Sequence, residues 1–118
     1  MSGVSKKTVK LWLENYHALQ AGEPIGENPF GGPKPEDGVT SSHLNKIMVD
    51  QAIQAMPPKL YQATNCRFIR EMLVVDAIKE MNCGRGTYYR RNRDSINFVH
   101  AYVNGYEFEL EELYQKYN

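Results

Sequence analysis

A segment rich in glycine and proline divides this chain near its N-terminus. Residues 22–41, with the sequence GEPIGENPFGGPKPEDGVTS, contain four of the six prolines and five of the nine glycines. Proline fixes φ and removes a backbone donor, and glycine adds conformational freedom, so no regular helix or strand is expected here. We therefore predict a loop or tether between an N-terminal segment, residues 1–21, and the larger part of the chain, residues 42–118.

Apolar side chains recur with helical spacing on both sides of this loop, which predicts amphipathic helices there. In residues 6–21 the stripe is formed by Val9, Trp12, Leu13, Tyr16 and Leu19. After the loop, the stripe that ends at Pro57-Pro58 is formed by Leu44, Ile47, Met48, Ala52, Ala55 and Met56. Ser41 or Ser42 is the expected N-cap of this second helix.

The apolar face around Trp12 must be buried, either on the core of its own chain or on a second subunit. Because residues 22–41 leave little to pack, we expect that residues 1–40 can be deleted without unfolding the remainder. The N-terminal helix is therefore treated as an appendage, and a homodimer is a candidate assembly.

Helical spacing continues after Pro57-Pro58, with a break expected near Val74. A further helix is expected from residue 85 to about residue 103, and residues 106–118 favour a terminal helix over an edge strand. The chain is therefore predicted to be all-α, a small helical domain containing a C-terminal helix-turn-helix, with an N-terminal helix on a Gly/Pro-rich loop.

Residues 75–99 have the pattern of this helix-turn-helix. Asn82 lies where the chain must reverse, and asparagine tolerates the left-handed backbone that such a turn uses. Cys83 is small enough to fill the corner, and Gly84 can cap or precede the second helix, in which Tyr88 turns inward. The inner positions of the two helices are then Val75, Ile78 and Met81, followed by Tyr88, Ser95, Ile96 and Val99.

Four of the six arginines lie in residues 82–94, NCGRGTYYRRNRD. If Tyr88 faces inward, the helical period turns the side of Arg90 and Arg93 outward. A DNA major groove admits one helix, and the guanidinium group matches guanine edges or phosphate. We interpret this helix as a DNA recognition helix. The predicted contacts are Arg85, Gly86, Thr87, Tyr89, Arg90, Arg91 and Arg93.

The stretch MNCGRGTYYRRNRDSI, residues 81–96, resembles the C-terminal helix-turn-helix of the ArpU-like family of phage transcriptional regulators, which is related in pattern to sigma-factor region 4. Members commonly carry T-Y-Y-R at the start of the recognition helix, here Thr87 to Arg90, and MPPKLYQ fits an upstream helix with a proline-marked start. The similarity covers about residues 56–103. It implies a sequence-specific regulator of phage or prophage origin that binds double-stranded DNA, with RNA polymerase as a further candidate partner.

The charge distribution is uneven although the formal net charge is zero, from 14 basic and 14 acidic side chains. Residues 67–94 carry seven basic and four acidic side chains, whereas residues 107–118 carry four acidic and one basic. Such a chain presents local basic and acidic surfaces to a partner, but no overall electrostatic attraction or repulsion.

Other classes of protein find little support in the sequence. No apolar run of about 18 residues predicts a membrane span, and the N-terminus lacks the apolar region of a secretory signal. Cys66 and Cys83 are read as reduced thiols of a cytoplasmic protein. The three histidines have no metal-ligand spacing, and no cofactor motif is present. No nucleophile and base can be paired, so we do not expect an enzyme.

The alternative function is a protein-interaction adaptor or inhibitor that does not bind DNA. Its contact surface would be the acidic C-terminal segment with its tyrosines, since tyrosine suits interfaces. These tyrosines are Tyr102, Tyr106, Tyr114 and Tyr117. Salt-sensitive binding to duplex DNA would separate the two functions.

Overall fold

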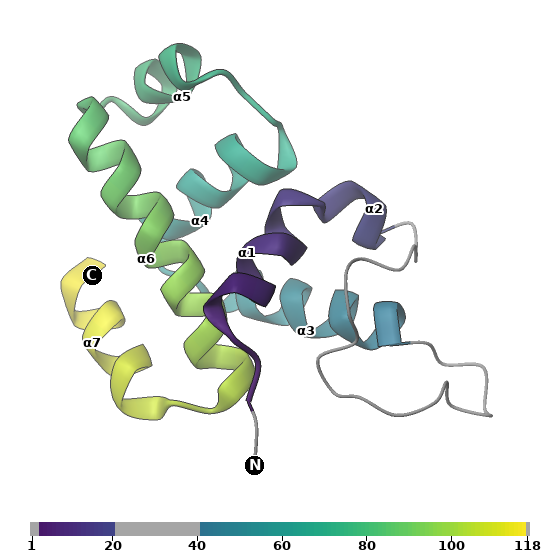
Figure 1. The fold of residues 1–118 in the computed structure, drawn as a ribbon. Coiled ribbons are helices and arrows are strands. Elements are labelled where there is room, and N and C mark those ends of the chain that lie inside the picture. Colours follow the sequence, from purple (N-terminus) through teal and green to yellow (C-terminus); the bar gives the residue numbers. More distant parts are fainter. Residues whose placement is uncertain (1–2, 21–40, 118) are drawn as a thin grey trace.

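A computed structural model describes residues 3–20 and 41–117, and over these residues it contains seven α-helices, one π-helical turn and no strand (Figure 1). The elements are α1 (Lys6–Glu14), α2 (Tyr16–Gln20), α3 (Ser41–Ala55), α4 (Pro58–Thr64), η1 (Asn65–Ile69), α5 (Val74–Met81), α6 (Arg85–Asn104) and α7 (Glu107–Tyr117). The prediction of an all-α fold is confirmed. Residues 21–40, with most of the Gly/Pro-rich loop, and the N-cap side chains of Ser41 and Ser42 lie outside the described part.

The helix predicted over residues 6–21 is two helices. Ser5 caps α1, because its side-chain oxygen accepts a hydrogen bond from the backbone N–H of Thr8 at 3.1 Å. Asn15 then interrupts the helix with φ −115° and ψ 33°, and its side-chain amide donates to the Leu11 carbonyl at 2.9 Å. Asparagine competes for helical backbone groups in this way, so the apolar spacing alone did not reveal the break.

Helix α6 is the centre of the fold, and it packs against α1, α3, α4, α5 and α7 (Figure 1). The main core lies around its second half, where Phe98 and Val99 are fully buried. Trp12 and Leu13 of α1 belong to the same core and have no exposed surface. This packing argues against the expectation that residues 1–40 are dispensable, because removal of α1 would open the core. A second subunit is not needed to cover Trp12.

The buried face of α3 differs from the predicted stripe. Leu44 and Ile47 are 44% and 40% exposed, whereas Val49 and Ile53 face the core. Apolar residues occupy two neighbouring faces of this helix, and the packing partners select the face that is buried. From Leu44 onward, the buried residues of α3 are Asn45, Val49, Ala52 and Ile53, and Met56 is buried just after its end.

Helix α5 and the start of α6 enclose a second, smaller core with α4 and η1. Tyr88 is 2% exposed and packs there, as predicted. Val75 was predicted to face inward but is 49% exposed. Helix α5 has neighbours on only one side, so its buried residues form a stripe with i, i+3, i+4, i+7 spacing. Val75 lies on the opposite side of the helix, which faces solvent. The stripe consists of Val74, Ala77, Ile78 and Met81.

The turn between α5 and α6 has the backbone predicted for it. Asn82 ends α5 with φ 51° and ψ 52°, in the left-handed region, and the N–H of Cys83 donates to the Ile78 carbonyl at 3.2 Å. Gly84 then precedes α6 in an extended conformation. This turn sets the direction in which the first residues of α6 leave the small core.

We predict that Asn82→Ala lowers the free energy of unfolding by about 1 kcal/mol, because alanine lacks the short polar side chain whose local hydrogen bonding lets asparagine tolerate a left-handed backbone. Asn82→Gly should match or slightly exceed the wild type, since glycine adopts this conformation without strain. Asn82 is exposed, so neither change removes packing. Urea denaturation followed by circular dichroism measures both. Equal stability of the alanine and glycine variants would contradict the left-handed turn.

Candidate nucleic-acid interface

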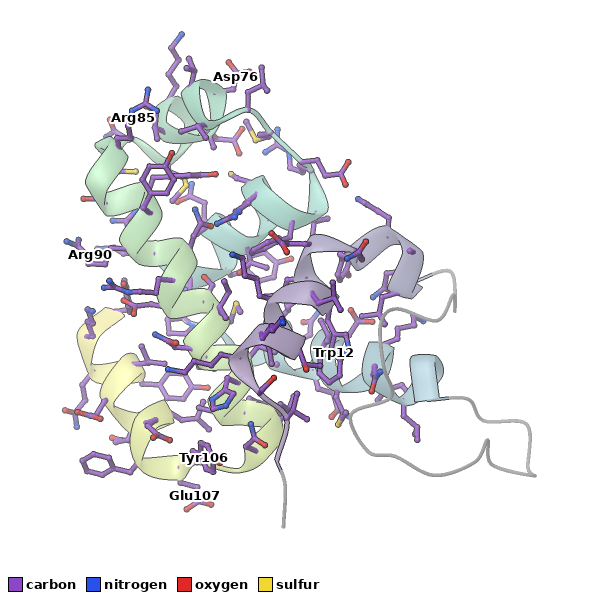
Figure 2. The ribbon with its side chains drawn as sticks, in the orientation of Figure 1. Trp12, Asp76, Arg85, Arg90, Tyr106 and Glu107 are labelled. Carbon is purple, nitrogen blue, oxygen red and sulfur yellow. The ribbon has the colours of Figure 1, made fainter. Side chains whose placement is uncertain are left out.

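The first turns of α6 carry an exposed stripe of basic and aromatic side chains. Figure 2 shows Arg85 at the start of the helix, beside α5, and Arg90 farther along on its outer side. Arg90 and Arg93 are exposed, and Tyr89 is 50% exposed. We call the side chains of Arg85, Tyr89, Arg90 and Arg93, together with the backbone at Gly86, the arginine stripe.

The remaining two predicted contact residues lie at the edge of this stripe. Thr87 and Arg91 are half-buried, and the Nε atom of Arg91 is buried without a hydrogen-bond partner among the described residues. Both side chains are therefore less accessible than the helical period alone suggested. Gly86 is exposed, and a Cβ atom added there would meet nothing within 4 Å. Its lack of a side chain thus serves no internal packing and leaves the backbone open from outside.

Two of the three arginines in the stripe form no ion pair within the described residues. The ion pairs found there are Arg70 with Glu80 and Lys116 with Asp94, so Arg85 and Arg93 form none. The N-cap residue of α6 is Gly84, so the helix also begins without a side-chain cap. Free N–H groups at a helix N-terminus carry a partial positive charge. The arginines and the helix end together make this surface favourable for an anion.

Contacts of Tyr88 and Asp94 anchor this part of α6 to the rest of the fold. Tyr88, on the opposite side of α6, lies in the small core with its ring edge against Tyr89, at a centroid distance of 5.2 Å. Two turns farther along, Asp94 is 4% exposed and binds the end of α7. Its Oδ2 atom accepts hydrogen bonds from Lys116 Nζ at 2.9 Å and from the Tyr117 hydroxyl.

The contact at Asp94 also limits how much of α6 is accessible. Because α7 doubles back and ends at Asp94, it covers the second half of α6 (Figure 1). The accessible part, residues 85–93, is about 13 Å long at 1.5 Å per residue. Sequence reasoning missed this role of Asp94, although a single carboxylate within an arginine-rich stretch was a usable signal.

The pKa of Asp94 reflects this environment. Burial opposes ionisation, but hydrogen bonds from Tyr117 and Lys116 outweigh it, so the pKa lies below its usual value. The same site raises the pKa of Tyr117 to about 12, through burial first and then through Asp94. Arg90 acts on Tyr117 in the opposite direction, which places its guanidinium near the end of α7.

We predict that Asp94→Asn lowers the free energy of unfolding by about 1–3 kcal/mol at neutral pH, through loss of hydrogen bonds to a charged group. A depressed carboxyl pKa stabilises the fold above the unfolded pKa of about 4, and this stabilisation is lost as pH falls through the folded value. The difference between wild type and variant should therefore shrink from pH 6 to pH 3 in urea denaturation. A difference that stays constant would contradict an ionised Asp94.

The two cysteines lie on either side of the small core. Cys66 is buried and Cys83 half-buried, and both are free thiols. The Cys66 thiol donates to Glu80 Oε2 at 3.4 Å. Burial, together with Glu80, raises the pKa of Cys66 to about 11, so this thiol is not an activated nucleophile.

Within residues 3–20 and 41–117, no three histidine, cysteine, aspartate or glutamate side chains are grouped as metal ligands. None of the helices described is long and apolar enough to cross a membrane. No family model, no curated protein and no solved structure matches this chain. The arginine stripe is therefore the feature of this molecule that supports a nucleic-acid interface.

Proposed function

We propose that this protein is a sequence-specific regulator of transcription that binds double-stranded DNA through the first half of α6. The observation that carries the proposal is the arginine stripe, which is exposed and lies on the helix directly after a tight turn. In helix-turn-helix proteins, the N-terminal residues of the second helix reach base edges in the major groove. The role is one of docking, without chemistry.

The dimensions of the stripe suit this role. An α-helix with its side chains is about 10–12 Å across, and the major groove is about 12 Å wide. The accessible segment, residues 85–93, would insert into the major groove. Helix α7, which is bound at Asp94, would prevent the rest of α6 from entering the groove. Arg93 and Gly86 lie at the centre of the stripe and face the base edges, whereas Arg85 and Arg90 flank them and meet phosphates.

The resemblance of residues 81–96 to ArpU-like regulators supports the same proposal and adds its biological setting. On that basis we propose a cytoplasmic protein of phage or prophage origin that acts on transcription, with RNA polymerase as a second partner. A homodimer on paired half-sites would fit this mode of binding if its two subunits met through a surface other than the arginine stripe.

We predict that selection from a random duplex library enriches one sequence motif, and that its affinity is strongly salt-dependent. With the three arginines of the stripe as cationic contacts, the slope of log affinity against log salt is about −2.7, so binding weakens roughly 40-fold from 50 to 200 mM salt. Fluorescence anisotropy of a labelled duplex measures this, with a scrambled duplex as the control. A selection without enrichment, or binding that salt does not change, would contradict the proposal.

The adaptor alternative is favoured by one observation on α7. Phe108 is 76% exposed and Tyr106 is 43% exposed, next to four exposed carboxylates. Aromatic side chains at such exposure are frequent in protein interfaces. Absence of any duplex binding would leave this surface as the functional one.

A further inference from the structure

Helix α7 carries an acidic surface that has no cationic partner among the described residues. Its four carboxylates are exposed, and none forms an ion pair within residues 3–20 and 41–117. Its one basic side chain, Lys116, is bound to Asp94. Phe108, 76% exposed, lies among the carboxylates. The carboxylates are Glu107, Glu109, Glu111 and Glu112.

A recess of about 480 Å³ lies between α7 and the second half of α6. Asn97 and His100 of α6 and Glu109 and Glu112 of α7 form its polar walls, and Ala101 and Leu113 contribute apolar lining. Lys6 and Lys116 complete the lining, but the charge of Lys116 is offset by Asp94. Burial and the nearby Lys6 lower the pKa of His100, so its imidazole is neutral at pH 7 and adds no positive charge.

The recess and the arginine stripe lie on one face of the molecule. Asn97 lies four residues after Arg93, and His100 lies seven residues after Arg93, so these three side chains share one side of α6. Arg85 and Arg90 lie toward one end of this helix, and Glu107, at the start of α7, lies toward the other (Figure 2). Along α6, this face therefore changes from basic to acidic.

We propose that this face binds a second copy of the chain about a two-fold axis. The arginine stripe of each copy seats against the recess and the carboxylates of α7 in the other copy. A two-fold interface must be self-complementary, and a surface that is basic at one end and acidic at the other meets that condition. Guanidinium groups pair well with carboxylates, and a formal net charge of zero removes overall repulsion between copies.

The proposed dimer has a regulatory consequence, which rests on the proposed DNA-binding function. The same arginines would contact either the second copy or DNA, so self-association and DNA binding would exclude each other. Salt-sensitive pairing of exposed charges suits such a reversible competition, because it is strong only at low ionic strength. DNA, itself a dense row of negative charges, would displace the acidic helix of the second copy.

The test is charge reversal followed by sedimentation velocity at about 20 mM and about 500 mM salt, where the Debye length falls from roughly 20 Å to below 5 Å. Wild type should be a dimer at low salt and a monomer at high salt. Arg90→Glu/Arg93→Glu and Glu109→Lys/Glu112→Lys should each stay monomeric, with self-association at least tenfold weaker. Their equimolar mixture should form a dimer again, because both pairs of surfaces are then complementary.

Circular dichroism of both variants checks that these exposed changes leave the helices intact. A monomeric wild type at low salt, a mixture that does not associate, or species larger than a dimer would each overturn the two-fold interface. Anisotropy with the selected duplex keeps this inference separate from the proposed function. Glu109→Lys/Glu112→Lys should bind duplex at least as tightly as wild type. A dimer that binds no DNA would refute the function alone, and a DNA-binding protein without this dimer would refute the inference alone.

Discussion

Truncation of Trp12 to alanine is expected to lower the free energy of unfolding by about 3–5 kcal/mol. Trp12 has no exposed surface and belongs to the core around α6, so its loss leaves a large cavity (Figure 2). Small domains are stable by only about 5–15 kcal/mol, and this single change removes a large part of that. Urea denaturation followed by circular dichroism measures it.

Leu11 provides the matched control, because it lies on the same helix but is 37% exposed. Leu11→Ala should change stability by less than about 1 kcal/mol. Deletion of residues 1–20 should be more severe than Trp12→Ala, since it also removes Val9, Leu13 and Leu19 from the core. A truncated protein with a cooperative transition and wild-type stability would show that α1 and α2 contribute nothing to the fold.

The double variant Arg90→Ala/Arg93→Ala is expected to lose most duplex affinity while it keeps its fold. Arg93 faces the base edges and should contribute about 1–3 kcal/mol to binding, and loss of the Arg90 phosphate contact adds to this, so affinity should fall at least roughly tenfold. Both side chains are exposed and outside the two cores, so the thermal transition should barely move. Anisotropy on the selected duplex and a circular dichroism melt give the two measurements.

Lys7→Ala/Lys10→Ala removes the same number of positive charges from the exposed side of α1 and serves as the control. It should weaken binding far less, because these lysines are not on α6. If both double variants lose affinity equally, binding depends on total charge and the α6 stripe has no special part in it. If neither loses affinity, α6 is not in the interface.

Residue type and helical spacing predicted the features that depend only on nearby residues in the chain. Asn82 was placed at the reversal because few residues accept a left-handed backbone, and the structure has that conformation. Tyr88 was placed inward by the helical period and is buried. The buried face of α3 and the exposure of Val75 depend on which neighbours a helix meets, and the local spacing of apolar residues does not contain that information.

The candidate site was predictable to a similar extent. The helical period correctly separated the exposed Arg90 and Arg93 from the buried Tyr88. It could not show that Arg91 is half-buried, or that α7 folds back to bind Asp94. Those contacts join residues more than twenty positions apart in the chain, so they follow from tertiary packing and not from spacing.

The most direct test of the α6 interface is titration of the ¹⁵N-labelled protein with the selected duplex, followed by two-dimensional NMR. We expect the largest amide shift changes at residues 85–93, with smaller changes at the end of α7 near Tyr117. Amides of α1 and α3, on the far side of the core, should stay unchanged. Shift changes centred on α7 at Glu107 and Phe108, or no changes at saturating duplex, would contradict DNA binding through α6.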